Sequence, residues 1–134
     1  MVAINNMAMQ GVTLTPKFVF GCNGQINNCL YQIDERKIVY VAGHNVIIYD
    51  PDERSQFFIP GSSNADAISN ISVSPSQKYM AICERGEVAA QCIIYDLENR
   101  KKIKTFPDAE VSEQILYQSH EFISCAFSIK NERQ

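Results

Sequence analysis

Short apolar segments recur along the chain, and glycine, proline or charged residues separate each one from the next. Segments of this kind, rich in β-branched and aromatic residues, predict strands, and the residues between them predict turns. In residues 38–42 consecutive positions are apolar, so both faces of this strand are expected to be buried. Such strands favour small sheets stacked face against face. The expected strands are residues 18–20, 29–33, 38–42, 46–49, 56–59, 67–73, 79–83, 92–95, 102–106 and 122–127.

Residues 37–50 (KIVYVAGHNVIIYD) and residues 78–97 (KYMAICERGEVAAQCIIYDL) present the same features in the same order. Each stretch begins with a lysine, continues with an apolar run, reverses near a glycine and reaches Ile-Ile-Tyr-Asp. Tyr49 and Tyr95 are 46 residues apart, and the two lysines are 41 residues apart. Both distances are close to the roughly 40–45 residues of a four-stranded propeller blade. The sequence therefore predicts an all-β fold made of WD40-type β-propeller blades.

The repeat divides the chain into four parts: a lead-in over residues 1–16, a first WD-like blade over 17–60, a second over 61–107, and the start of a third blade with a divergent polar tail over 108–134. Residues 108–119 predict a loop with a short strand, and a single helical turn is the alternative. The chain would then hold about two and a half four-stranded antiparallel blades, whereas closed propellers have roughly 4–8. An incomplete propeller leaves sheet faces uncovered, which predicts self-association or unfolding without a sharp transition.

Three short motifs resemble WD repeats. Tyr95-Asp96 resembles the Trp-Asp pair, with tyrosine in the tryptophan position, and Ser74-Pro75 resembles the Ser-Pro-Asp turn. Residues 126–128 resemble the strand before the next such turn. Gly43-His44 lies between the second and third strands of its blade, whereas the family's Gly-His precedes the first strand, so the family's hydrogen-bonded tetrad is incomplete.

A closer resemblance covers about residues 15 to 128. Residues 58–87 (FIPGSSNADAISNISVSPSQKYMAICERGE) resemble the first propeller of the cilia- and flagella-associated protein 57 family. That family consists of long axonemal proteins in which WD propellers precede a coiled coil. After Ser128, residues 129–134 replace the family's Pro-Asp turn and no coiled coil follows, so the sequence is interpreted as a fragment, an alternative terminus or a short paralogue. Residues 16–24, 30–35 and 40–45 also share the resemblance.

The resemblance implies a non-catalytic scaffold in the axoneme of motile cilia, within the cytoplasm and cytoskeleton. It implies protein partners among inner dynein arm or nexin–dynein regulatory components. The alternative function is a generic cytosolic WD40-type adaptor without a ciliary role.

Charge and hydropathy narrow the classes of partner. The net charge of −3 argues against a nucleic-acid surface, which needs clustered positive charge. The basic cluster is expected to be a solvated strand edge that discourages strand addition, with a polyanion site as the minor alternative. The N-terminus lacks the pattern of a secretory signal, and no run approaches the roughly 20 apolar residues that span a bilayer. We therefore expect neither nucleic acid nor membrane as a partner. The cluster consists of Arg100, Lys101, Lys102 and Lys104.

The five cysteines have no CxxC spacing, and their number is odd. They indicate a reduced, intracellular protein in which cysteines within apolar runs act as small buried hydrophobes. Neither histidine has a close cysteine pair in the sequence, so no zinc site is expected. The cysteines are Cys22, Cys29, Cys83, Cys92 and Cys125.

The remaining polar motifs predict turns and not chemistry. His44 and His120 are interpreted as polar turn or loop residues, although an enzyme that uses His44 with loop carboxylates is a third hypothesis. Gly21 and Gly24 lack the strand–helix setting of a phosphate loop, and the acidic residues of the 50–53 turn lack EF-hand spacing. Asp50 and Asp96 are expected to end strands and organise turns. We predict no catalytic, cofactor-binding or metal-binding residue. Asp52 and Glu53 complete the acidic turn, and the Asn70 glycosylation sequon is attributed to chance.

Overall fold

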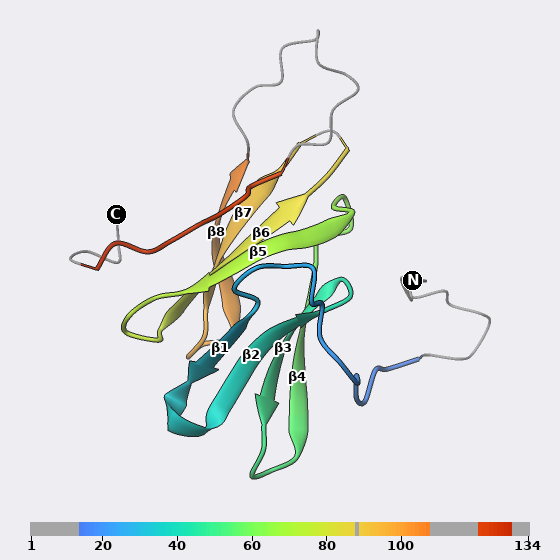
Figure 1. The fold of residues 1–134 in the computed structure, drawn as a ribbon, viewed down its shortest axis with the longest axis vertical. Helices are drawn as coiled ribbons and strands as arrows, with labels where there is room; N and C mark the ends of the chain where they lie inside the picture. The colour runs from blue at the N-terminus through green and yellow to red at the C-terminus, as the bar shows by residue number, and fades with distance from the viewer. Residues whose placement is uncertain (1–13, 88, 108–120, 130–134) are drawn as a thin grey trace, which may run out of the picture.

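The computed structural model describes residues 14–87, 89–107 and 121–129, and these contain two four-stranded antiparallel sheets (Figure 1). Sheet 1 consists of β1 (Leu30–Ile33), β2 (Lys37–Ala42), β3 (Asn45–Asp50) and β4 (Ser55–Pro60). Sheet 2 consists of β5 (Ala67–Val73), β6 (Tyr79–Arg85), β7 (Gln91–Asp96) and β8 (Lys101–Pro107). In both sheets the strands lie in chain order, as in a propeller blade. The prediction of an all-β fold of WD-type blades is confirmed.

The turns of sheet 1 follow from local backbone preferences. Ala42 pairs with Asn45, so the β2–β3 connection is the two-residue turn Gly43-His44. Gly43 has a φ of 60°, which glycine adopts without a steric penalty. The charged turn expected between β1 and β2 is a short 3₁₀ turn, Asp34–Arg36, with φ values of 51° at Asp34 and 50° at Glu35. These turns fix the register that places Val39 opposite Ile48.

The main core lies between the two sheets. One face of sheet 1 contributes Val39, Val41 and Ile48, and the facing side of sheet 2 contributes residues such as Met80 and Ile93, all buried. The Tyr31 hydroxyl donates a 3.1 Å hydrogen bond to the carbonyl oxygen of Ile71, which joins β1 to β5. The sheets therefore pack face against face, as the apolar runs predict. The remaining buried members of this core are Ile33, Val46, Ile59, Ile68, Ile71, Ile82 and Tyr95.

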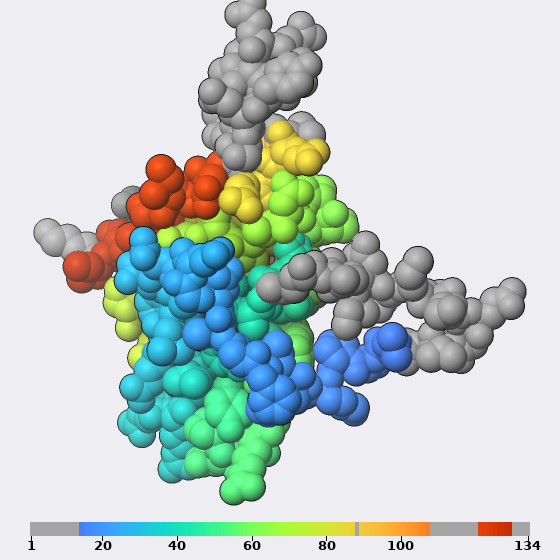
Figure 2. All heavy atoms as spheres, turned by 45° about the vertical axis from the view of Figure 1, so that its right-hand side comes forward, coloured from blue at the N-terminus to red at the C-terminus, as the bar shows by residue number. Residues whose placement is uncertain are grey.

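A second, smaller core lies on the other face of sheet 1. Tyr40 and Ile47 are buried there, and Val19 packs against them from the segment before β1. The Phe18 ring lies edge-on to Tyr49, with ring centroids 6.2 Å apart. In Figure 2 this segment, in blue, lies over sheet 1. The outer face of sheet 1 is thus partly covered by the chain itself, whereas the repeat count predicted an uncovered face.

Two expected strands do not form. Residues 18–20 form no ladder, and the side chain of Gln56 in β4 bonds their main chain. The Val19 amide donates to Gln56 Oε1 at 2.7 Å, and Gln56 Nε2 donates to the Val19 carbonyl at 3.0 Å. Residues 122–127 also have no strand ladder. Side chains of β5 hold this segment, because Ser69 Oγ donates to the carbonyl of Phe122 at 3.1 Å. Both predictions were wrong because side chains of β4 and β5, and not their main chains, make the hydrogen bonds to these segments.

The repeated tyrosines occupy equivalent places in the two sheets. Tyr49 pairs with Ile38 across β2–β3, and Tyr95 pairs with Met80 across β6–β7. Tyr95 lies in the core between the sheets, whereas Tyr49 lies on the outer face of sheet 1. The internal repeat in the sequence is therefore a repeat of structure. The loop or helical turn expected at residues 108–119 lies outside the described residues, as do the remainder of the polar tail and His120.

Candidate interaction surfaces

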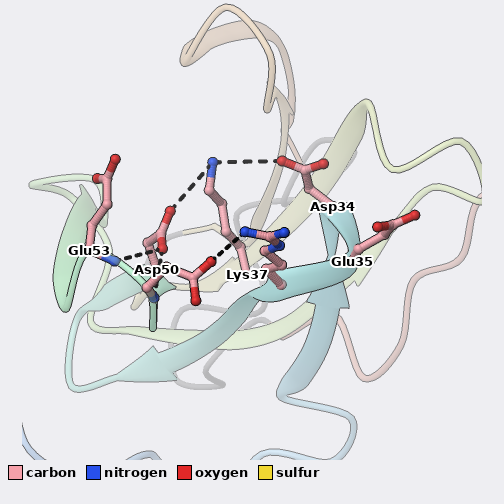
Figure 3. A pocket seen from close by; sticks show the side chains of 7 residues that line it. Asp34, Glu35, Lys37, Asp50 and Glu53 are labelled. Atoms are coloured by element: carbon pink, nitrogen blue, oxygen red, sulfur yellow. Dashed lines mark hydrogen bonds and ion pairs between the residues drawn. The ribbon is translucent and has the colours of Figure 1, made fainter.

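Charged residues line a hollow of about 390 Å³ at one end of sheet 1, where the β1–β2 and β3–β4 turns meet (Figure 3). The Lys37 ammonium lies between two carboxylates, 3.7 Å from Asp34 and 3.8 Å from Asp50. Arg36 Nη1 pairs with Asp52 Oδ2 at 2.7 Å. Arg36, Asp52 and Asp34 are largely exposed, so the ion pairs that they form add little to stability. Lys37 and Asp50 are partly buried. Glu35 and Glu53 complete the lining.

The acidic residues of this rim already act as turn acceptors. Asp50 Oδ1 accepts hydrogen bonds from the amides of Asp52, at 3.1 Å, and Glu53, at 3.2 Å. In sheet 2, Asp96 Oδ1 accepts from the Asn99 amide at 2.8 Å, and this bond lowers the pKa of Asp96. Both residues thus organise the turns after their strands, as expected. Within the described ranges, no group of three or more histidine, cysteine or acidic side chains is arranged to hold a metal ion.

His44 lies at the opposite end of the same hairpin. It occupies the β2–β3 turn, whereas Lys37 and Asp50 mark the other ends of β2 and β3, about 17 Å away at the rise of an extended strand. The His44 Nε2 atom lies 3.0 Å from the carbonyl oxygen of Ser62. The structure does not bring His44 to the acidic 50–53 turn.

Gly61 allows His44 to approach the loop that joins the sheets. Its amide donates a 2.8 Å hydrogen bond to the His44 carbonyl, and a Cβ at Gly61 would overlap the His44 ring. Gly61→Ala should therefore lower the free energy of unfolding by about 1–3 kcal/mol, as overpacking does. In a His44→Ala background the same change should cost close to nothing. Urea unfolding of the four proteins in this double-mutant cycle measures the coupling, and an equal cost in both backgrounds would contradict the overlap.

A buried carboxylate ties the same loop to sheet 2. Glu84 is 1% exposed, and its Oε1 accepts a 2.8 Å hydrogen bond from the Ser62 amide. Its Oε2 accepts from Gln91 Nε2. A buried charge persists only where it is paired or hydrogen-bonded, so these two donors hold Glu84 in place. Sequence reasoning missed this residue, although its position two residues after the inward-facing Ile82 is a signal that could have found it.

Apolar side chains are exposed at both ends of the stack of two sheets. On the segment that covers sheet 1, Phe18 is 44% exposed and Phe20 is 89% exposed. On the segment beside β5, Ile123 is 88% exposed and Ile129 is 89% exposed. The Phe18 and Phe20 rings lie together, with centroids 5.0 Å apart, and exposed apolar surface of this kind indicates protein contacts. We call these two sets the N-terminal patch (Phe18 and Phe20) and the C-terminal patch (Ile123 and Ile129).

The basic cluster lies along an exposed edge. Every residue of β8 is exposed, and β8 ends the strand order of sheet 2. The Arg100 guanidinium, just before β8, lies 4.6 Å from the centre of the Phe57 ring in β4. This cation–π contact joins sheet 2 to sheet 1. The lysines form the solvated edge that the sequence indicates. Asn70, the sequon residue, is 6% exposed within β5, which agrees with a chance match.

None of the described residues forms a helix with the length and apolar character needed to cross a membrane.

The chain is similar to three ciliary proteins. It is 31% identical over 116 residues to cilia- and flagella-associated protein 57 C of Tetrahymena thermophila, and the match covers 87% of this chain and 9% of that protein. It is 28% identical over 125 residues to cilia- and flagella-associated protein 57 of Mus musculus, with 90% of this chain and 9% of the relative covered. Cilia- and flagella-associated protein 44 of Mus musculus is 29% identical over 97 residues, 72% of this chain and 5% of the relative. The chain thus spans about a tenth or less of these relatives.

The chain was also compared with protein-family models and with solved structures. No protein-family model matches the chain. A chain in the crystal structure of the mitotic checkpoint complex superimposes with a TM-score of 0.44 at 14% identity, over 69% of this chain and 33% of that one.

Proposed function

We propose, from the premise that this chain is a homologue of cilia- and flagella-associated protein 57, that it is a non-catalytic WD-repeat scaffold segment of the motile-cilium axoneme. The observation that carries the proposal is the sequence relationship, which extends over 87% of the chain. Relatives named for cilia and flagella support a ciliary role. Protein contact is the task that two stacked blades with exposed apolar ends can perform.

The geometry supports contacts through the ends of the stack. Tyr95 of sheet 2 packs against sheet 1, and the equivalent Tyr49 presents the same packing position on the opposite side of sheet 1. Residues 17–60 and 61–107 are accordingly proposed to be successive blades, with residues 108–134 beginning a third. A further blade, or a second copy of the chain, would meet the N-terminal and C-terminal patches.

A non-catalytic role is supported by how the polar residues are used. His44 is held against the Ser62 carbonyl, and Asp50 and Asp96 are occupied by turn amides. The buried Glu84 is occupied by two donors. These candidate catalytic residues thus make structural hydrogen bonds.

Localisation tests the ciliary part of the proposal. A tagged chain expressed in motile ciliated cells is expected in the axoneme after the membrane has been removed with detergent. A variant with both patches changed, Phe20→Thr with Ile123→Thr, should be retained less well, because its folded core is untouched but its exposed contacts are lost. Recovery of the wild-type chain only in the soluble fraction would favour the cytosolic adaptor.

Inner dynein arm or nexin–dynein regulatory components are the proposed partners. Proximity labelling from the tagged chain in the axoneme should mark these components above a tagged soluble control. Labelling of other axonemal complexes alone would remove this part of the proposal and leave the ciliary scaffold intact.

A further inference from the structure

Three thiols come together on the outer face of sheet 2. Cys83 of β6 lies directly opposite Cys92 of β7, and Asn70 of β5 lies opposite Cys83 on the other side. Directly paired residues of an antiparallel sheet point to the same face, so these side chains form one row. Cys83 is fully buried, and Cys92 is partly buried. The row therefore holds two of the three thiols side by side, and the third comes from a segment that is distant in the sequence.

Cys125 belongs to residues 121–129, drawn in red in Figure 1, and Ser69 and Asn70 of β5 bond this segment. The Cys125 Sγ donates a 3.5 Å hydrogen bond to Asn70 Oδ1, and Asn70 lies directly opposite Cys83 in the β5–β6 ladder. The segment is fixed further by Asn70 Nδ2, which donates to the Ile123 carbonyl at 3.3 Å. All three cysteines are free thiols. Cys125 is thus held on the outer face of sheet 2, bonded to the direct cross-strand neighbour of Cys83.

We propose that Cys83 and Cys125 form a reversible disulfide on exposure to a hydroperoxide such as hydrogen peroxide, which fastens residues 121–129 to sheet 2. The Cys125 thiolate attacks one peroxide oxygen, which breaks the O–O bond, forms a sulfenic acid and releases hydroxide. The Cys83 sulfur then attacks the Cys125 sulfur. The S–O bond breaks, and the Cys83 proton leaves with the hydroxyl group as water. Two electrons pass from the two thiols to the peroxide.

The thiol electrostatics agree with these roles. Interaction with Cys83 lowers the pKa of both Cys125 and Cys92, so these two thiols, and not Cys83, are disposed to react as thiolates. Interaction with Cys125 raises the pKa of Cys83, which therefore keeps its proton until the second step. Cys125 is partly exposed and Cys83 is buried, so the peroxide reaches Cys125 first.

Geometry selects Cys125 over Cys92 as the partner of Cys83. The Cβ atoms of directly paired strand residues lie about 4.5–5.5 Å apart, whereas a disulfide needs about 3.5–4.5 Å. A Cys83–Cys92 disulfide would require the β6 and β7 backbones to move closer together than their hydrogen-bonded ladder allows. Residues 121–129 have no ladder to distort, so Cys125 can adjust to the geometry of the bond.

Peptide mapping of the full chain distinguishes the possible bonds. Trypsin places Cys83, Cys92 and Cys125 on three separate peptides, residues 79–85, 86–100 and 105–130. After treatment with hydrogen peroxide and alkylation of the remaining thiols, the first and third peptides should appear joined, lighter by two hydrogens than their sum. Thiol titration should show the loss of two of the five thiols. Dithiothreitol should restore both.

Matched variants give the control. Cys125→Ser should abolish the joined pair of peptides, whereas Cys29→Ser, which changes a thiol bonded to the Asn23 carbonyl, should leave it unchanged. A bond from Cys83 to Cys92, a bond between two chains, or only sulfinic and sulfonic products would each overturn the proposal. So would unreacted Cys83 and Cys125 under conditions that oxidise Cys22. None of these outcomes depends on a ciliary role.

Discussion

Ile93→Ala lowers the free energy of unfolding by about 2–5 kcal/mol, as the loss of a fully buried isoleucine does. Ile93 is 2% exposed and lies in the core between the two sheets. Its partners in neighbouring strands are Ile82 and Thr105, so a shortened side chain leaves a cavity where β6 and β7 meet sheet 1. Native proteins are stable by only about 5–15 kcal/mol, so this loss shifts the urea midpoint strongly.

The neighbouring residue provides the control. Ile94 points to the opposite face of β7, is only partly buried, and pairs with Ala81 and Lys104. Ile94→Ala removes the same atoms, but some of them are already exposed to solvent. The variant should therefore lower the free energy of unfolding less than half as much as Ile93→Ala. Both variants are compared with the wild-type chain by urea unfolding at one protein concentration. Equal losses would mean that the two faces of β7 are equally buried, which contradicts the stacking of the sheets.

The isolated chain should self-associate through its two apolar patches, and removing them should restore a monomer. Phe20 and Ile123 are 89% and 88% exposed, so changing them to threonine takes little from the folded core. Full burial of such a side chain contributes about 1.5–3 kcal/mol. Losing both from an interface should weaken association about 100-fold or more, since about 1.4 kcal/mol corresponds to a tenfold change. Analytical ultracentrifugation over a range of concentrations measures the effect.

Leu30→Thr is the matched control for the two patches. Leu30 is 63% exposed, but it lies at the start of β1 and outside both patches. This variant should associate as the wild-type chain does. A wild-type chain that stays monomeric at every concentration would show that the patches are covered by the chain or tolerated in solvent. Weakened association in Leu30→Thr would locate the interface elsewhere.

Local sequence patterns predicted the strands of both sheets to within a few residues. β5 begins and ends where the sequence indicates, and the other seven strands differ by one or two residues at their ends. The agreement is physical: alternation, turn glycines and turn prolines act between neighbours in the chain. Residues 18–20 and 122–127 have the same apolar character, but a strand also needs a hydrogen-bonding neighbour, which their own sequence does not supply.

Local sequence patterns could not predict the contacts that define the candidate sites. Glu84 looks like an ordinary polar residue at the end of a strand until Ser62 and Gln91 are brought to it. His44 and the acidic turn look close along the chain, yet the hairpin holds them at opposite ends. In each case the deciding contact joins different elements of the fold.

The sequence by itself determined the all-β fold, the repeated blade and the family relationship, because these follow from the period and order of residues along the chain. Only the tertiary structure decided which face of each strand lies between the sheets. It also decided that Val19 packs on the outer face of sheet 1, and that Cys125 reaches Asn70 beside Cys83 on the outer face of sheet 2. These features depend on how the sheets stack and where the connecting segments return, and packing between residues distant in the sequence sets both.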